Sequence, residues 1–126
     1  MGATILIVED NDSNMKLFRD VLAAHGHETV GTRDGAGAME IINEVEPDLV
    51  VMDIQLPDVS GLEVTRWIRE HDRLSATPVV AVTAFAMKGD AERIMNAGCD
   101  AYLAKPITID EFMSVVQKFL DMRQAG

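Results

Sequence analysis

Short apolar runs that each end in a polar residue recur along this chain, and they constrain its fold more than any other feature. Residues 4–8 precede Glu9 and Asp10, residues 49–52 precede Asp53, residues 79–82 precede Thr83, and residues 101–104 precede Lys105. The stretches between the runs show the apolar spacing of helices. Because strands that alternate with helices form parallel sheets covered on both faces, the sequence predicts an α/β fold.

One more strand, the second along the chain, is predicted over Glu28–Thr32, and its polarity suggests its place in the sheet. A polar strand suits an edge, whereas the nearly pure aliphatic runs at 4–8, 49–52 and 79–82 suit the buried centre. We therefore predict a (βα)5 doubly wound, five-stranded parallel sheet of the flavodoxin-like type, with strand order 2-1-3-4-5.

Helix-type patterns and end signals place five helices between and after these strands. In the second of these helices, which is expected to begin near Asp34, the apolar spacing predicts that four residues face the core: Ala38, Ile41, Ile42 and Val45. The helices are expected from an N-cap near Asp12 or Ser13 to before Gly26, from near Asp34 to before Pro47, after Gly61, from Gly89 to Ala97, and from Thr108 onward.

Composition narrows the class of protein. The 126 residues fit one domain spanning 1–126, and because little chain follows the last predicted helix, no output domain is expected. The net charge of −10 disfavours nucleic acid and anionic membrane surfaces as partners. With one cysteine, no membrane-length apolar stretch and no signal peptide, a cytoplasmic protein is the simplest interpretation.

The polar residues at the strand ends predict a site for a divalent metal. In parallel sheets the carboxyl ends of the strands lie side by side, and ligands bind in the crevice outside them. Crowded carboxylates repel one another unless a cation neutralises them, and Mg²⁺ prefers oxygen ligands. We expect Asp10 and Asp53 to bind Mg²⁺ directly, Glu9 to act through a bound water, and the backbone carbonyl of Gln55 to be a further ligand.

The same strand ends carry groups suited to phosphoryl transfer. Lys105 can pair with phosphate oxygens as a point charge, and the hydroxyl of Thr83 can serve another oxygen. Asp53, at the end of a central strand, is the predicted nucleophile, because carboxylates form aspartyl phosphates. Positioning and charge neutralisation dominate this chemistry, and the set supplies both.

Five short motifs occur in order along the chain: Ile7-Val8-Glu9-Asp10-Asn11, Met52-Asp53-Ile54-Gln55-Leu56-Pro57, Ser60-Gly61, Val82-Thr83-Ala84 and Lys105-Pro106. In these motifs the chain resembles the receiver domain of bacterial two-component response regulators, and the resemblance covers nearly its whole length. Two stretches, 14–18 and 83–90, further resemble the single-domain DivK type, and the second also resembles receivers fused to hybrid kinases.

The resemblance implies a role for each matching position. Asp53 matches the phosphoacceptor, and Glu9 and Asp10 match the acidic pair around Mg²⁺. Thr83 and Lys105 match the switch hydroxyl and the phosphate-binding lysine. Tyr102 matches the aromatic switch residue, although it could also be an edge-strand aromatic with its hydroxyl in water. Pro106 matches a proline whose preceding peptide bond is usually cis.

The function implied is phosphorelay signalling without dedicated enzyme turnover. A histidine kinase or histidine phosphotransfer protein would donate a phosphoryl group to Asp53, which could autodephosphorylate slowly. The fourth helix, fifth strand and fifth helix would form the face read by a downstream protein. Two alternatives remain open at this stage, a Mg²⁺-dependent phosphatase with an aspartyl nucleophile and a pseudo-receiver that only binds partners. Candidate kinase contacts on the first helix are Asn14, Met15, Leu17 and Phe18, of which Met15 and Phe18 could instead be core.

Overall fold

Five parallel strands alternate with five helices in the computed structural model, which describes residues 2–84 and 89–125. The strands are β1 (Thr4–Val8), β2 (Glu28–Thr32), β3 (Leu49–Asp53), β4 (Val79–Thr83) and β5 (Ala101–Ala104). The helices are α1 (Asp12–Ala24), α2 (Gly35–Val45), α3 (Gly61–Glu70), α4 (Asp90–Asn96) and α5 (Ile109–Ala125). Part of the 83–90 stretch, residues 85–88, lies outside the described residues.

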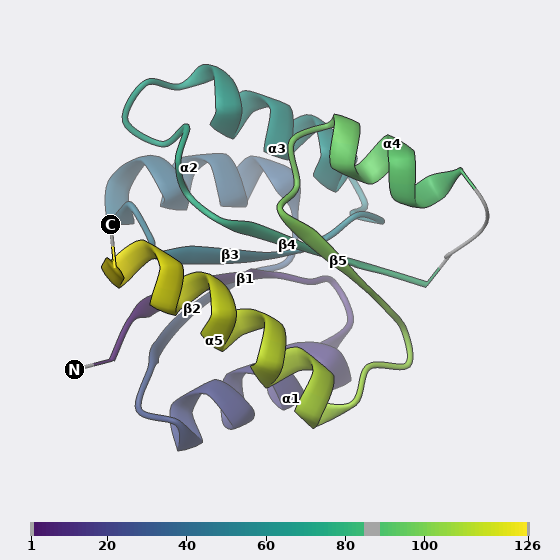
Figure 1. Ribbon diagram of the computed structural model, residues 1–126. Coiled ribbons are helices and arrows are strands. Elements are labelled where there is room, and N and C mark those ends of the chain that lie inside the picture. The colour runs from purple at the N-terminus through teal and green to yellow at the C-terminus, as the bar shows by residue number, and fades with distance from the viewer. Residues whose placement is uncertain (1, 85–88, 126) are drawn as a thin grey trace.

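The strand order is β2-β1-β3-β4-β5, which confirms the predicted topology. Figure 1 shows α1 and α5 on one face of the sheet and α2, α3 and α4 on the other. Each face has its own core: Phe18 of α1 stacks on Phe112 of α5 with ring centroids 4.8 Å apart, whereas Ile42, Ile68 and Ile94 pack on the opposite face. Among the described residues, no helix has the length and apolar character needed to cross a bilayer.

The burial of the strands explains their order. Every residue of β3 and β4 is buried, as expected for central strands covered by helices on both sides. No residue of the edge strand β2 is fully buried. The aliphatic runs thus occupy the centre because only there are both of their faces removed from water.

Local signals at the helix ends agree with the predictions except in two details. The side chain of Asn11, one residue earlier than predicted, caps α1 by accepting a hydrogen bond from the Asn14 amide. The hydroxyl of Thr108 accepts from the Glu111 amide at the start of α5, as the capping pattern predicted. Val45 was predicted to face the core, but it is 40% exposed, because it is the last residue of α2 and the chain turns away at Glu46, which has φ 49°.

Candidate functional site

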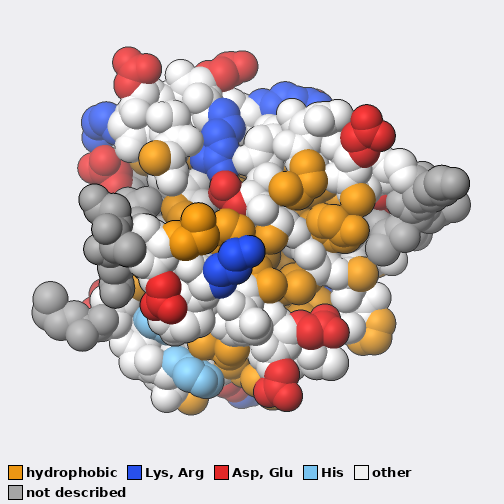
Figure 2. Space-filling view, in the orientation of Figure 1, with side chains coloured by type: hydrophobic (Ala, Val, Ile, Leu, Met, Phe, Trp, Pro, Cys, Tyr) orange, Lys and Arg blue, Asp and Glu red, His pale blue; other side chains and the backbone are white. Residues whose placement is uncertain are grey.

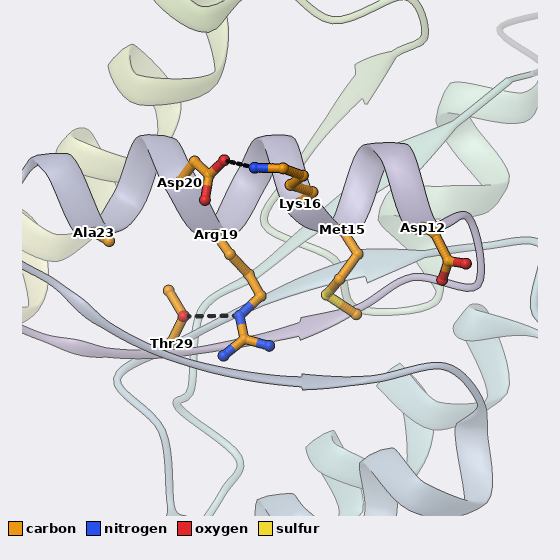
Figure 3. Close-up of a pocket in the computed structure, with 7 residues that line it drawn as sticks. All are labelled: Asp12, Met15, Lys16, Arg19, Asp20, Ala23 and Thr29. Carbon is orange, nitrogen blue, oxygen red and sulfur yellow. Dashed lines mark hydrogen bonds and ion pairs between the residues drawn. The ribbon is translucent and has the colours of Figure 1, made fainter.

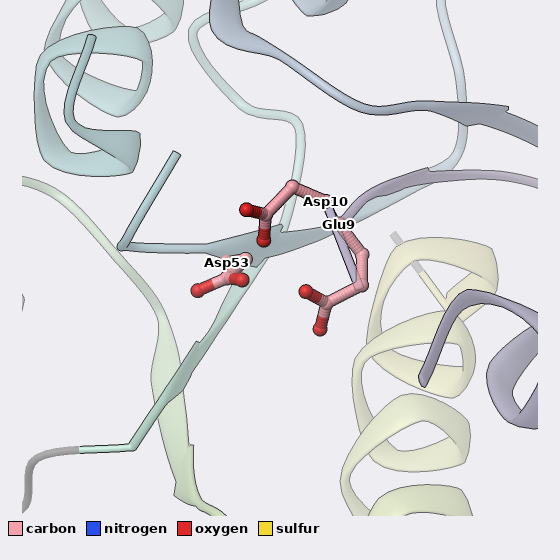
Figure 4. Close-up of side chains that lie close together, drawn as sticks. All are labelled: Glu9, Asp10 and Asp53. Carbon is pink, nitrogen blue, oxygen red and sulfur yellow. The ribbon is translucent and has the colours of Figure 1, made fainter. Parts of the chain in front are cut away.

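Three carboxylates meet at the carboxyl edge of the sheet, where the strand ends were predicted to converge. Val8 pairs with Met52 across β1 and β3, so Glu9 and Asp53 leave neighbouring strands at the same level. Carboxylate oxygens of Glu9, Asp10 and Asp53 lie within 4.8 Å of one another. Figure 4 shows the three side chains pointing toward a common space.

Glu9 is held deep in this edge. Its side chain is 1% exposed, and its amide donates to the Thr32 carbonyl on β2. Oxygen Oε2 accepts a hydrogen bond of 3.3 Å from the Asn11 amide, whereas the buried Oε1 is paired with the Lys105 ammonium and not with a backbone group. Asp10, the next residue, is exposed.

Asp53 is the second buried carboxylate, at 2% exposure. Its Oδ1 accepts a hydrogen bond of 3.0 Å from the Gln55 amide. The chain returns close to Asp53 at Gly61, where a β-carbon would collide with the Asp53 carbonyl oxygen and lie 2.9 Å from the α-carbon of Ile54. Glycine at 61 therefore lets α3 begin directly against the strand end that carries Asp53.

Lys105 supplies the positive charge beside these acids. Its Nζ lies 3.1 Å from Oε1 of Glu9 and 3.4 Å from Oδ2 of Asp53. Its amide donates to the Thr83 carbonyl, and the peptide bond between Lys105 and Pro106 is cis. One ammonium thus faces two buried carboxylates, which leaves the cluster short of positive charge.

The imbalance appears in the protonation of Glu9. Burial raises the pKa of Glu9 from 4.5 to about 7, and the adjacent carboxylate of Asp53 adds to the rise, while the Lys105 ammonium opposes it. A carboxyl group with a pKa near neutrality holds a proton that a metal ion would displace.

The donor set fits a hard divalent cation. Three carboxylates lie within reach of one point, and among the described residues a single ammonium, that of Lys105, pairs with the two buried ones, so their negative charge is only partly neutralised. Oxygen ligands of this kind suit Mg²⁺ or Ca²⁺, and no histidine or cysteine among the described residues joins the cluster. The backbone carbonyl of Gln55 follows Asp53 by two residues.

The remaining predicted residues lie on β4, β5 and the turn after β5. Thr83 ends β4 next to the strand that carries Asp53, and its side chain is buried. Tyr102 lies on the edge strand β5 opposite Ala81 and is 39% exposed. Pro106 is exposed after Lys105. The sheet therefore brings five of the predicted residues to one edge: Glu9, Asp10, Asp53, Thr83 and Lys105. Tyr102 lies two residues before the end of β5.

A separate groove of about 480 Å³ runs beside α1 and β2, shown in Figure 3. Lys16 pairs with Asp20 at 2.6 Å, and Nε of Arg19 donates to the Thr29 hydroxyl, so the charged lining is largely paired within the protein. None of the clustered carboxylates lines this groove. We therefore place the candidate site at the strand ends.

Two residues near the site escaped the sequence-based reasoning. The carboxylate of Asp58 accepts hydrogen bonds from the Gly35 and Ala36 amides at the start of α2. Arg33 pairs with Asp12 at 2.7 Å and donates to the Asp10 carbonyl. An aspartate in a loop or an arginine before a helix gives no signal by itself, although two glycines in the first turn of α2 could have indicated a close approach of another segment.

Comparison with known proteins agrees with this geometry. Residues 5–117 match the response regulator receiver domain. The chain is 54% identical over 120 residues to the polar-differentiation response regulator DivK of Brucella anthropi, and the match covers 95% of this chain and 98% of that protein.

Two solved structures of receiver domains are also similar to this chain in sequence and in fold. One is the receiver domain of a sensor histidine kinase from Pseudomonas aeruginosa PAO1, which has a magnesium ion coordinated in its active site cleft. It is 33% identical to this chain with a TM-score of 0.88, and the match covers 96% of this chain and 99% of that one. The signal receiver domain of a signal transduction histidine kinase from Syntrophus aciditrophicus is 28% identical with a TM-score of 0.89, over 95% and 91% of the two chains. The chain belongs to the response regulator receiver domain family.

Proposed function

We propose that this chain is a DivK-like single-domain receiver that accepts a phosphoryl group on Asp53 from a phosphohistidine of a histidine kinase or phosphotransfer protein. Family membership makes it a protein of phosphorelay signalling. The observation that carries the proposal is the meeting of three carboxylates, a lysine ammonium and the end of β4 at one edge of the sheet.

Mg²⁺ is the proposed cofactor. Asp10 and Asp53 would bind it directly, Glu9 through a water, and Gln55 through its backbone carbonyl. When bound, the ion neutralises the crowded carboxylates and the charge on the transferred phosphoryl group. The magnesium ion in the cleft of the Pseudomonas receiver supports this choice.

Asp53 is the proposed nucleophile. A carboxylate oxygen forms a bond to phosphorus while the bond from phosphorus to the donor's imidazole nitrogen breaks, and the imidazole leaves with the electron pair. Lys105 is already 3.4 Å from Asp53, and its ammonium would pair with a phosphate oxygen. The Thr83 hydroxyl would donate a hydrogen bond to another phosphate oxygen, which would link the reaction to β4.

The donor is proposed to dock beside the first turns of α1. Leu17 is 38% exposed there, and a small crevice between α1 and α5 is lined by Leu17, Ile107 and Ile109. Phe18 is buried against Phe112 and belongs to the core. The exposed contact proposed on α1 is therefore Leu17, with the partly buried Asn14 about one turn before it. Met15 is also partly buried, but it packs against the core and lines the separate groove beside β2.

The output face is proposed to comprise α4, β5 and α5. Figure 2 shows hydrophobic side chains gathered at the surface on the side that carries these elements. Tyr102 is 39% exposed and Met95 is 44% exposed. Phosphorylation would draw Thr83 toward the phosphate and open space for Tyr102, which shifts the population of two states of this face.

Incubation with Mg²⁺ and acetyl phosphate or phosphoramidate, followed by intact-mass spectrometry, tests the proposal. We expect one phosphoryl group per chain, slowly reversed, lost when Mg²⁺ is chelated and absent in Asp53→Ala. Multiple turnover on phosphate esters would instead indicate a phosphatase. A wild-type chain that gains no phosphoryl group would indicate a pseudo-receiver.

A further inference from the structure

The loop between β3 and α3, residues 54–60, is bonded to the start of α2 through one side chain. Oδ1 of Asp58 accepts a hydrogen bond of 2.8 Å from the Gly35 amide, and Oδ2 accepts one of 2.9 Å from the Ala36 amide. Both carboxylate oxygens are thus engaged by backbone groups of another element. These bonds hold the pKa of Asp58 below its usual range.

The first turn of α2 is shaped for this contact. A β-carbon at Gly35 would collide with the side chain of Val59 and lie 3.1 Å from Cγ2 of Val64. Asp34 already caps the helix by accepting from the Gly37 amide at 2.7 Å. Asp58 therefore satisfies two further amides that the ordinary N-cap leaves unpaired, and it does so from a different loop.

Hydrogen bonds also join the beginning and the end of this loop. The Gly61 amide donates to the Ile54 carbonyl at 2.9 Å, and the Gln55 amide donates to Asp53. Gln55 is therefore held on one side by these bonds and on the other by the contact of Asp58, three residues later, with α2. Its backbone carbonyl is the proposed metal ligand on this loop, so the path of the loop decides where that carbonyl lies.

We propose that Asp58 is a positioning residue for the metal site, which holds the Gln55 carbonyl in place by bonding the β3–α3 loop to the first turn of α2. The inference rests on the proposed function, since it assigns Mg²⁺ to this cluster. Residues that orient metal ligands without touching the metal change its affinity about 10–100-fold when they are removed.

Asp34→Ala is the matched control for Asp58→Ala. Each change removes one negative charge and hydrogen bonding to the same helix end, but Asp34 accepts its hydrogen bond from Gly37 of the helix that it precedes, whereas Asp58 bonds that helix from the loop that carries Gln55. If Asp58 only caps α2, both variants should lower the melting temperature and leave Mg²⁺ binding alike. If Asp58 positions the loop, the two variants should differ in Mg²⁺ affinity.

Isothermal titration with Mg²⁺ and thermal melting of wild type and both variants test this. We expect Asp58→Ala to bind Mg²⁺ about tenfold more weakly than Asp34→Ala, the low end of the range for such residues, and excess Mg²⁺ to restore its phosphorylation by acetyl phosphate. If Asp58→Ala does not fold, Asp58→Asn, which keeps one acceptor oxygen, should show an intermediate loss. Equal affinities in the two variants would overturn this inference alone, whereas a wild-type chain that binds no Mg²⁺ would overturn the proposed function as well.

Discussion

The ammonium nitrogen of Lys105 lies 3.1 Å from Oε1 of Glu9, a carboxylate oxygen shielded from solvent. Because Asp53 is only 3.4 Å from the same nitrogen, removal of this charge leaves two buried acids with no cationic partner in the part of the chain that the structure describes. We predict that Lys105→Met lowers the free energy of unfolding by about 2 kcal/mol in metal-free buffer, less than for a fully buried pair because the lysine side chain is 21% exposed.

Urea denaturation in EDTA measures this loss, and Mg²⁺ should reduce it because the ion replaces the missing charge. Lys16→Met is the control: its partner Asp20 is exposed, so the change should have little effect. Equal stability of Lys105→Met and wild type in EDTA would show that the lysine does not compensate the acids.

Removal of an acid from the same cluster should act in the opposite direction. Asp53→Ala relieves repulsion with Glu9 and removes one of the two carboxylates that Lys105 must balance. We predict that the metal-free variant is more stable by about 1 kcal/mol at low salt, which is roughly 4 °C in melting temperature for a domain of this size. Thermal melting in EDTA measures it, and a lower melting temperature than wild type would argue against a crowded acidic site.

The raised pKa of Glu9 gives stability a defined pH dependence. The pKa is about 7 in the folded state and 4.5 for the free carboxyl group, so the folded state binds more protons between these values. The free energy of unfolding should therefore fall as pH rises through this window. In metal-free buffer we expect a fall from pH 5.5 to 7.5 that is about 2 kcal/mol larger in wild type than in Glu9→Gln.

Comparison with Glu9→Gln cancels the other titrating groups, and chemical denaturation at each pH gives the difference. Mg²⁺ should reverse the trend, since it binds the deprotonated carboxylates. The rise in melting temperature on Mg²⁺ addition should be larger at pH 7.5 than at pH 5.5. Identical pH profiles for wild type and Glu9→Gln would mean that the carboxyl group titrates normally.

Gly61 tests the close packing behind Asp53, the proposed phosphoacceptor. A β-carbon there meets backbone atoms of Asp53 and Ile54, which cannot rotate away as a flexible side chain could. We predict that Gly61→Ala costs about 2–3 kcal/mol, as overpacking of a core does, and slows phosphorylation by acetyl phosphate. Gly26→Ala is a useful comparison because no atom lies near its β-carbon position and its φ of +85° makes any cost purely conformational. Phosphorylation at the wild-type rate in Gly61→Ala would refute the effect on Asp53.

The strand order and the five converging side chains could be predicted because each depends on a pattern along the chain. Aliphatic runs that need both faces covered define the centre of the sheet, and in a parallel sheet the end of each run then falls at one edge. The places of Glu9, Asp53, Thr83 and Lys105 follow from topology alone, without knowledge of any side-chain contact.

Contacts between segments that share no pattern could not be predicted. Asp58 reaches the amides of Gly35 and Ala36 because two loops pass close together, and nothing near Asp58 in the sequence encodes that distance. Val45 had the spacing of a core residue but lies where the helix ends and its packing surface stops. Periodicity gives the direction of a side chain, whereas contacts depend on where each element begins and ends.

Arg69 of α3 bonds the segments that precede β4 and β5, at the end of the sheet opposite the candidate site. Its guanidinium donates to the carbonyls of Thr77 at 2.6 Å and Gly98 at 2.8 Å, and it pairs with Asp100 at 2.7 Å. A lysine cannot match this planar set of donors. We therefore predict that Arg69→Lys lowers the free energy of unfolding by about 2 kcal/mol. Arg66→Lys, an exposed site on the same helix, should change it little, and since neither residue lies near Asp53, both variants should accept a phosphoryl group from acetyl phosphate. Equal urea midpoints for the two variants would show that the three bonds contribute no net stability.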